Sequence, residues 1–182
     1  MAENKQEREE SSWIALRKEL RKRTFEPASH ASFVMYFLFA VVVFGGAGIW
    51  VEGHSYIWYV ETVENPHHSA SALRTAVLTF FPALAGSACM QLIWADDIFK
   101  PLRSFAMCVL VALVALIFVV APSVVSNTVA LLAGVFASMI ALWTWWIANA
   151  RQRDLLDIDI DAPTGKKDTS GELAGDLGGF KT

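Results

Sequence analysis

Residues 104–150 read SFAMCVLVALVALIFVVAPSVVSNTVALLAGVFASMIALWTWWIANA and contain no Lys, Arg, Asp, Glu or His. As a single helix rising about 1.5 Å per residue, this stretch would extend roughly 70 Å, more than twice the ~30 Å hydrocarbon core of a bilayer. The chain must therefore turn once within it. Pro122 removes a backbone donor there, and Ser126 and Asn127 supply polar turn and capping groups. The stretch predicts a transmembrane helical hairpin.

Two further apolar runs lie upstream of this hairpin. The whole sequence is 54% hydrophobic and 18% charged, and the charged residues gather at the two ends of the chain. We therefore predict an all-α integral membrane protein with a cytoplasmic N-terminal segment over 1–30, a four-helix transmembrane bundle over 31–150, and an acidic, Gly-rich, largely disordered cytoplasmic tail over 151–182. The four spans are expected at about residues 31–50, 75–94, 105–121 and 128–148.

The N-terminal segment is expected to contain a short amphipathic helix that Ser11 or Ser12 can cap. Trp13, Leu16 and Leu20 recur at helical spacing, and basic residues occupy the other side. Such a helix suits the surface of an anionic leaflet, although it can also pack on a partner or on the bundle itself. The residues expected to contact the membrane surface are Trp13, Arg17, Lys18, Arg21, Lys22 and Arg23.

Small residues on two of the predicted spans indicate close helix packing. A glycine cluster in the last third of the first span permits either a tight contact or a bend. Three small residues at four-residue spacing share one face of the fourth span, which is expected to contact a helix of the same chain or of another subunit. The first set is Gly45, Gly46 and Gly48, and the second is Ala130, Gly134 and Ser138.

Basic residues predict the orientation in the membrane. In a four-span arrangement, one side receives the basic N-terminal segment, the connection that contains Lys100 and Arg103, and the basic start of the tail. The opposite side receives Arg74 alone. Because positive charge next to a span is retained in the cytoplasm, we expect a multi-pass protein of the inner (plasma) membrane with both termini cytoplasmic.

The predicted spans contain no Lys, Arg, Asp, Glu or His, and their ionisable side chains are the thiols of Cys89 and Cys108 and the phenol of Tyr36. Ion pathways, proton relays and intramembrane enzymes normally place such groups inside the membrane. We therefore expect a protein that is not an enzyme, and we predict no catalytic, cofactor-binding or metal-binding residue. The candidate polar contacts, which could line a pore in an oligomer, are Thr79, Ser87 and Gln91 on the second span.

Two classes of function fit these features. The first is a small non-enzymatic membrane protein that serves as an anchor, sensor or accessory subunit through its cytoplasmic ends. Its expected partners are the lipid bilayer, further copies of the chain, and a soluble or membrane protein, with no role for nucleic acid. The tail residues expected to bind a partner protein are Leu155, Ile158 and Ile160.

The second class is an oligomeric pore or channel, including one that permeabilises the membrane in a phage-defence or toxin setting. A small membrane subunit of a transporter is a further alternative. The layout is similar to that of four-span membrane subunits in both settings, and this similarity rests on the number of spans alone.

Overall fold

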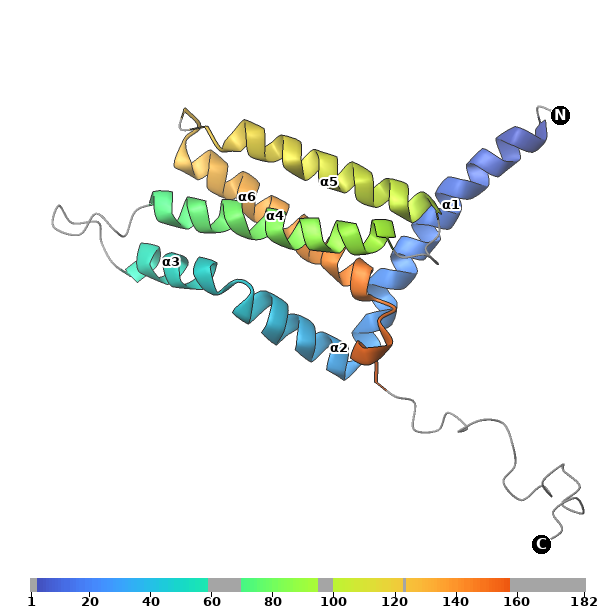
Figure 1. Ribbon diagram of the computed structural model, residues 1–182, viewed down its shortest axis with the longest axis horizontal. Coiled ribbons are helices and arrows are strands. Elements are labelled where there is room, and N and C mark those ends of the chain that lie inside the picture. Colours follow the sequence, from blue (N-terminus) through green and yellow to red (C-terminus); the bar gives the residue numbers. More distant parts are fainter. Residues whose placement is uncertain (1–2, 59–69, 95–99, 123, 158–182) are drawn as a thin grey trace, which may run out of the picture.

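The computed structural model describes residues 3–58, 70–94, 100–122 and 124–157. Within these ranges its regular structure is helical, as predicted, and contains no strand. Three of these helices are long and apolar enough to cross a membrane, and they lie side by side (Figure 1). They are α4 (Ala70–Trp94), α5 (Lys100–Val120) and α6 (Asn127–Asn149).

These three helices cover the second, third and fourth predicted spans, with different starting points. Helix α4 begins at Ala70 and continues through Pro82 without a break. Helix α5 begins at Lys100 because Pro101 falls in its first turn, where a backbone N–H has no helical acceptor. The predicted turn at Pro122 separates α5 from α6, and the Ser126 hydroxyl caps α6 by accepting from the backbone N–H of Val129 at 3.4 Å.

The first apolar run is divided, contrary to the continuous span predicted over 31–50. It consists of α2 (Ala31–Tyr36), a π-helix η2 (Phe37–Phe44) and α3 (Ala47–Trp58). The π-helix ends where the N–H of Gly45 donates to the carbonyl of Ala40 at 3.0 Å, five residues back. Gly45 and Gly46 follow as a turn between η2 and α3, so the apolar run does not form one continuous α-helix.

The N-terminal helix α1 (Glu3–Phe25) is longer than the short helix predicted, and Ser11 and Ser12 lie inside it and do not cap it. The 3₁₀ helix η1 (Glu26–Ser29), with Pro27 near its start, connects α1 to α2. Residues Ser12–Ser29 and Ala31–Phe44 meet at 94°, and counting this bent pair as one span gives a fourth candidate crossing. The pair is bent because proline and the 3₁₀ turn interrupt the α-helix.

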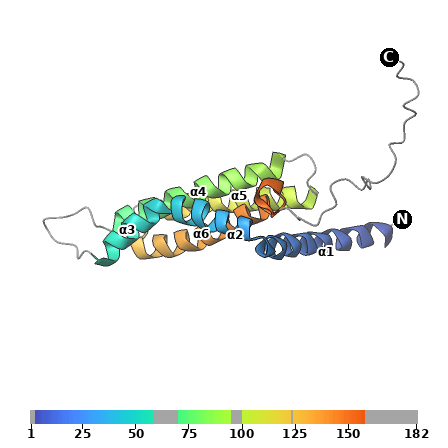
Figure 2. The ribbon, with the colours of Figure 1, turned by 90° about the horizontal axis from the view of Figure 1, so that it is seen from below.

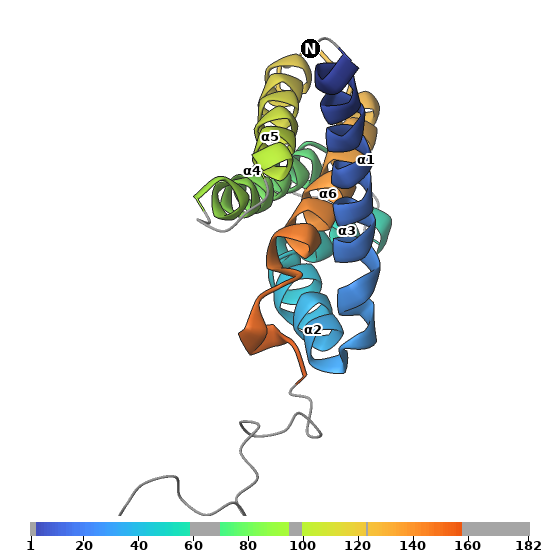
Figure 3. The same cartoon turned by 90° about the vertical axis from the view of Figure 1, so that its right-hand side faces the viewer.

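Helix α1 lies across one end of the other helices, which we call the α1 end. The start of α2, the end of α4, the start of α5 and the end of α6 are all at this end (Figure 1). From below, α1 extends past the helices (Figure 2), and from the right-hand side it runs across their ends (Figure 3). The end of α3, the start of α4 and the turn between α5 and α6 lie at the opposite end.

Helix α4 is the centre of the packing, with α6, α5 and α3 in contact with it. Its side chains Phe81 and Ala85 are buried against Leu113 of α5 and Ala137 and Ala141 of α6. A second cluster at the α1 end includes Leu16, and a third joins α2 to the end of α6. Side chains from distant parts of the chain therefore form a continuous series of small cores.

The small-residue face of α6 contacts α4 of the same chain. Ala130, Gly134 and Ser138 are buried, and a Cβ atom built on Gly134 would lie 2.5 Å from Cγ1 of Val77. The Ser138 hydroxyl donates to the Gly134 carbonyl at 2.8 Å, so its polar group is satisfied within the helix. Of the two contacts that the sequence allowed, the structure shows the one within the chain.

The glycine cluster lies at the break after η2 and makes no close contact with a neighbouring helix in the described part of the chain. Cβ atoms on Gly45 and Gly46 would each lie 2.4 Å from a carbonyl oxygen four residues earlier in the same segment. Gly46 is also covered by Trp50, whose indole N–H donates to the Val42 carbonyl at 2.9 Å. A Cβ on Gly48 would meet no atom within 4 Å. Of the two roles that the sequence allowed for these glycines, the structure shows the bend in the first apolar run.

Candidate functional site at the α1 end

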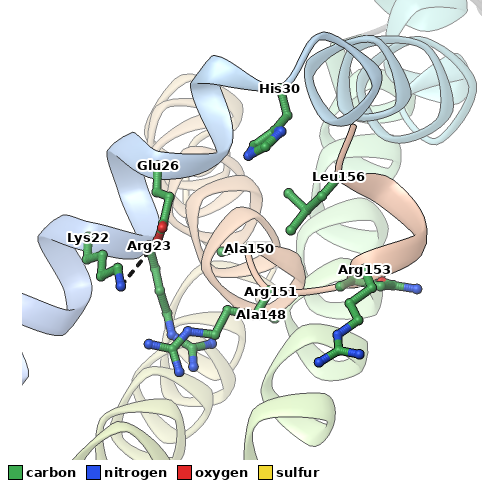
Figure 4. A pocket seen from close by; sticks show the side chains of 10 residues that line it. Lys22, Arg23, Glu26, His30, Ala148, Ala150, Arg151, Arg153 and Leu156 are labelled. Carbon is green, nitrogen blue, oxygen red and sulfur yellow. Dashed lines mark ion pairs between the residues drawn. The ribbon is translucent and has the colours of Figure 1, made fainter. Parts of the chain in front are cut away.

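The C-terminal end of α1 and the residues that follow α6 meet around a pocket of about 660 Å³ at the α1 end. Its walls come from the end of α1, from η1 and His30, from the end of α6 and from the 3₁₀ helix η3 (Arg153–Leu155) with its flanking residues (Figure 4). Apolar side chains of Ala148, Ala150 and Leu156 form part of its surface. The charged side chains around it are Lys22, Arg23, Arg151 and Arg153, which are basic, and Glu26, which is acidic.

One carboxylate connects α1 to the end of α6. Glu19 Oε1 accepts from Nε of Arg23 at 2.7 Å and from Nη2 of Arg151 at 2.6 Å. Arg23 Nη1 also donates to the backbone carbonyl of Ile147 at 3.3 Å. Arg23 is 3% exposed, so the predicted contact of this residue with the membrane surface is wrong. Its guanidinium is held inside the protein, where its charge is compensated by Glu19.

Two tryptophans of α6 complete the attachment of α1. The indole N–H of Trp146 donates to the Thr24 carbonyl at 3.0 Å, and that of Trp143 donates to the Thr24 hydroxyl at 3.2 Å. Leu16 of α1 is buried in a cluster with Leu92 and Ile147. The helix therefore packs on its own protein through one face, which is one of the alternatives that its sequence allowed.

The opposite face of α1 is exposed and carries both basic and apolar side chains. The remaining residues predicted to contact the membrane surface are all exposed in the structure. Ile14 and Phe25, which the sequence pattern did not single out, are exposed as well. The exposed residues from the prediction are Trp13, Arg17, Lys18, Arg21 and Lys22.

The start of the tail folds back onto α2. Leu155 and Leu156 pack against a cluster that includes Phe33 and Trp145. Leu155 was predicted to bind a partner protein, but the structure uses it inside the chain. Ile158 and Ile160, predicted for the same role, lie outside the described residues.

Asp157 fixes this part of the tail at the start of α2. Its Oδ1 accepts from the backbone N–H of Ser32 at 3.2 Å, and its Oδ2 lies 3.9 Å from Nδ1 of His30. Hydrogen bonding with the Ser32 side chain, with the backbone N–H groups of Ser32 and Ala31, and the nearby imidazole lower the pKa of Asp157, against a smaller opposing effect of burial. The charged carboxylate is therefore the form that holds the tail.

A protonation experiment checks this attachment. Because the pKa of Asp157 in the folded protein is below its ordinary value of 3.8, its contribution is fully present above pH 3.8 and is lost as the pH falls through the folded pKa. The amide resonance of Ser32 in an NMR titration is expected to shift with a midpoint below 3.8. Asp157→Asn should abolish that shift, whereas Asp154→Asn should preserve it. A Ser32 titration in Asp157→Asn identical to that of the unmodified chain would contradict the assignment.

The shared carboxylate gives a second prediction. Glu19→Gln keeps the shape and one acceptor but removes the charge between two guanidinium groups, one of them buried. We expect a loss of about 1–2 kcal/mol in the free energy of unfolding, measured by thermal melting in detergent. The matched control is Glu26→Gln, because the ion pair of Glu26 with Lys22 is exposed and 3.8 Å long. That control should change stability by less than ~0.5 kcal/mol, and equal effects of the two variants would refute the special role of Glu19.

The predicted polar contacts of the second span do not come together at one site. Thr79 and Ser87 line an open groove of about 400 Å³ between α3 and α4, together with Gly45 and Gly48. Both hydroxyls donate to carbonyls of their own helix. Gln91 is exposed on α4 and is not among the residues that line this groove.

Arg74, which entered the sequence analysis only as a charge, is the most extensively hydrogen-bonded side chain at the other end of the molecule. It lies near the start of α4, and its acceptors among the described residues lie at the last residue of α5, in the turn that follows and at the first residue of α6. The guanidinium thus joins three helices and satisfies carbonyls that a helix end leaves open. Nη2 donates to the carbonyls of Val120 (2.7 Å), Ala121 (3.1 Å) and Pro122 (2.9 Å), and Nη1 to the carbonyl of Val125 (3.1 Å) and Oδ1 of Asn127 (3.0 Å).

Within the described residues, no group of three or more His, Cys, Asp or Glu side chains is placed to hold a metal ion. The charged groups at the α1 end are donors and acceptors suited to binding an anion or to fixing helices. Comparisons with protein-family models, with curated proteins and with solved structures find no match to this chain.

Proposed function

We propose that this chain is a non-enzymatic, multi-pass protein of an inner (plasma) membrane, and that it acts as an anchor, sensor or accessory subunit through its cytoplasmic ends. The observation that carries the proposal is that the N-terminal helix α1 and the start of the tail are attached to each other and to α2 at the α1 end. Glu19 links α1 to Arg151, and Leu155 and Asp157 attach the start of the tail to α2. A subunit that presents its tail to a partner needs such a fixed starting point.

In this proposal the segments from α2 to α3 form a crossing beside α4, which gives a four-helix transmembrane bundle. Helix α1 turns away from that crossing by 94°, an angle suited to a helix lying among the lipid headgroups. The α1 end carries Lys100 and Arg151 as well as the basic face of α1. This clustering of positive charge supports the placement of both termini in the cytoplasm.

The partner in this proposal is a soluble or membrane protein that binds the tail beyond Asp157. This part contains the apolar residues Ile158 and Ile160 among alternating aspartates. A second copy of the chain is a further expected partner through the membrane-facing helices. Neither association involves nucleic acid or a cofactor.

Truncation tests the proposed role. A chain that ends at Asp157 retains every described contact of the tail, so it should insert, fold and melt like the full chain. We expect it to lose the proteins that the full chain captures from membranes solubilised in mild detergent. Capture by the truncated chain equal to that by the full chain would refute a role for the tail. A cysteine placed at Thr182 that reacts with an impermeant reagent in intact cells would overturn the proposed orientation.

A pore is the second candidate, because Thr79 and Ser87 are exposed along the groove between α3 and α4. In an oligomer, such a groove could face water. Ion conductance across liposomes that contain the purified chain tests this candidate. If Thr79→Val with Ser87→Ala abolishes both conductance and cellular function while the chain ending at Asp157 keeps them, the pore replaces the accessory subunit as the function.

A further inference from the structure

The pocket at the α1 end has more positive than negative charge at close range. Four basic side chains line it, and Glu26 is the acidic residue among its lining. Glu19, which lies behind Arg23 and Arg151, adds a second carboxylate. Asp157, whose Oδ2 lies 3.9 Å from Nδ1 of the lining residue His30, adds a third. Four positive and three negative charges leave a formal excess of one positive charge. An anion that enters this pocket is therefore attracted to it.

The basic side chains also retain hydrogen-bond donors. A guanidinium has five N–H groups, and Glu19 accepts from Arg23 and Arg151 through a single oxygen. Within the described part of the chain, no ion pair is found for Arg153, which extends from η3 into the same space (Figure 4). Arg23, Arg151 and Arg153 all line the pocket, and each guanidinium is a planar, charged donor of the kind that suits phosphate oxygens.

The position of the pocket indicates where the anion comes from. The pocket adjoins α1, whose free face combines Arg17, Lys18 and Arg21 with exposed Trp13 and Phe25. That combination is typical of a helix at the depth of lipid headgroups. The apolar wall formed by Ala148, Ala150 and Leu156 suits the part of a lipid next to its phosphate. Basic pockets of this kind, at the cytoplasmic ends of transmembrane helices, bind anionic headgroups.

We propose that this pocket binds a phosphate group, supplied by the headgroup of an anionic phospholipid, through Lys22, Arg23, Arg151 and Arg153. A soluble phosphate compound offers the same chemistry and is the other source to be tested. The inference goes beyond the proposed accessory function and shares with it only the location in the membrane. A lipid held here would contact both α1 and η3.

Binding to the full chain in a nonionic detergent tests the proposal, with native mass spectrometry and thermal melting as readouts. Phosphatidylglycerol is expected to bind saturably and to raise the melting temperature, and phosphatidylcholine is not. Inorganic phosphate forms the second arm. If phosphate alone saturates the pocket and phosphatidylglycerol binds no better, the pocket serves a soluble phosphate and the lipid source is wrong.

Matched double variants separate the pocket from general surface charge. Lys22→Gln with Arg153→Gln removes two exposed residues of the pocket, and Arg17→Gln with Lys18→Gln removes the same charge from the free face of α1. The first pair is expected to weaken phosphatidylglycerol binding about 25-fold, from about fivefold per basic residue. The second pair should change it less than about threefold, and both proteins should melt normally without lipid.

Equal weakening by the two double variants, or the absence of saturable binding of both lipid and phosphate, would overturn the proposal. Neither result bears on capture of a partner by the tail, which the chain ending at Asp157 tests separately. Loss of partner capture with unchanged lipid binding in that truncated chain would support both proposals. The two proposals can therefore fail independently.

Discussion

A Gly134→Leu variant is expected to lose about 3 kcal/mol in its free energy of unfolding, measured by thermal melting in detergent with circular dichroism. The first added carbon would already lie 2.5 Å from Cγ1 of Val77, and Val77 is itself buried. A leucine extends further in the same direction, so α6 has to move away from α4. Because α4 packs against α3, α5 and α6, this displacement affects most of the helix packing.

Two controls make this prediction specific. Gly86→Ala also replaces a glycine, but a Cβ there would meet no atom within 4 Å, so stability should be equal or slightly higher. Gly134→Ala combined with Val77→Ala should lose at least about 1 kcal/mol less than the sum of the two single losses, since the second change removes the clashing methyl group. Additive losses, or an unchanged Gly134→Leu protein, would show that α4 and α6 do not meet at this position.

Arg74→Ala is expected to cost about 3 kcal/mol in the same measurement, although no core side chain is touched. The five acceptors around the turn between α5 and α6 would lose a charged donor at once. Three of them are successive carbonyls at the end of α5, where the helix dipole also favours a positive charge. Val120 is buried, so its carbonyl in particular has few other donors.

Arg74→Lys distinguishes hydrogen bonding from charge. Lysine keeps the positive charge but presents it at one atom and not over a planar fork, so we expect it to restore about half of the lost stability. Lys100→Ala removes an exposed positive charge at the α1 end and should have an effect below ~0.5 kcal/mol. Full rescue by lysine would attribute the effect to charge alone. A melting temperature of Arg74→Ala equal to that of the unmodified chain would refute the role of Arg74.

The sequence was sufficient for the features that depend on nearby residues. The hairpin follows from a run too long and too apolar to cross a bilayer once, and the break occurs at Pro122 as predicted. The spacing of Ala130, Gly134 and Ser138 identified a buried face of α6. It did not identify the neighbour, because small residues at this spacing suit any helix that comes close.

The contacts at the α1 end could not be predicted from the sequence, for a different reason. Arg23 donates to Ile147, 124 positions away in the sequence. Periodicity describes one helix at a time, so it could place Arg23 among the other basic residues of α1 but not bury it. The prediction for Leu155 failed for the same reason. The alternation of acidic and apolar residues around it suggested an exposed tail, but its side chain packs against a cluster that includes Trp145.

Arg74 shows what a closer reading of the sequence can add. It is the one basic residue on its side of the predicted spans, and the hairpin turn on that side leaves the carbonyls at the end of α5 without helical donors. These two facts together favour an arginine that caps the turn. The number and choice of its five acceptors still required the structure.

The π-helix Phe37–Phe44 has a consequence for which changes this part of the chain can accept. Each of its bonds encloses one residue more than an α-helical turn, so α3 is rotated relative to the direction that a continuous α-helix would give it. Phe33 and Phe37 lie at or before the start of the π-helix and contact Trp146 of α6. Helix α3, which follows the π-helix, lies against α4. Exchanges among apolar residues within the segment preserve this geometry, but deletion of one residue would turn α3 away from its neighbour. Natural variation in Phe37–Phe44 should therefore keep the length fixed and exchange apolar residues mainly at positions other than Phe37 and Val41, which pack inside the protein.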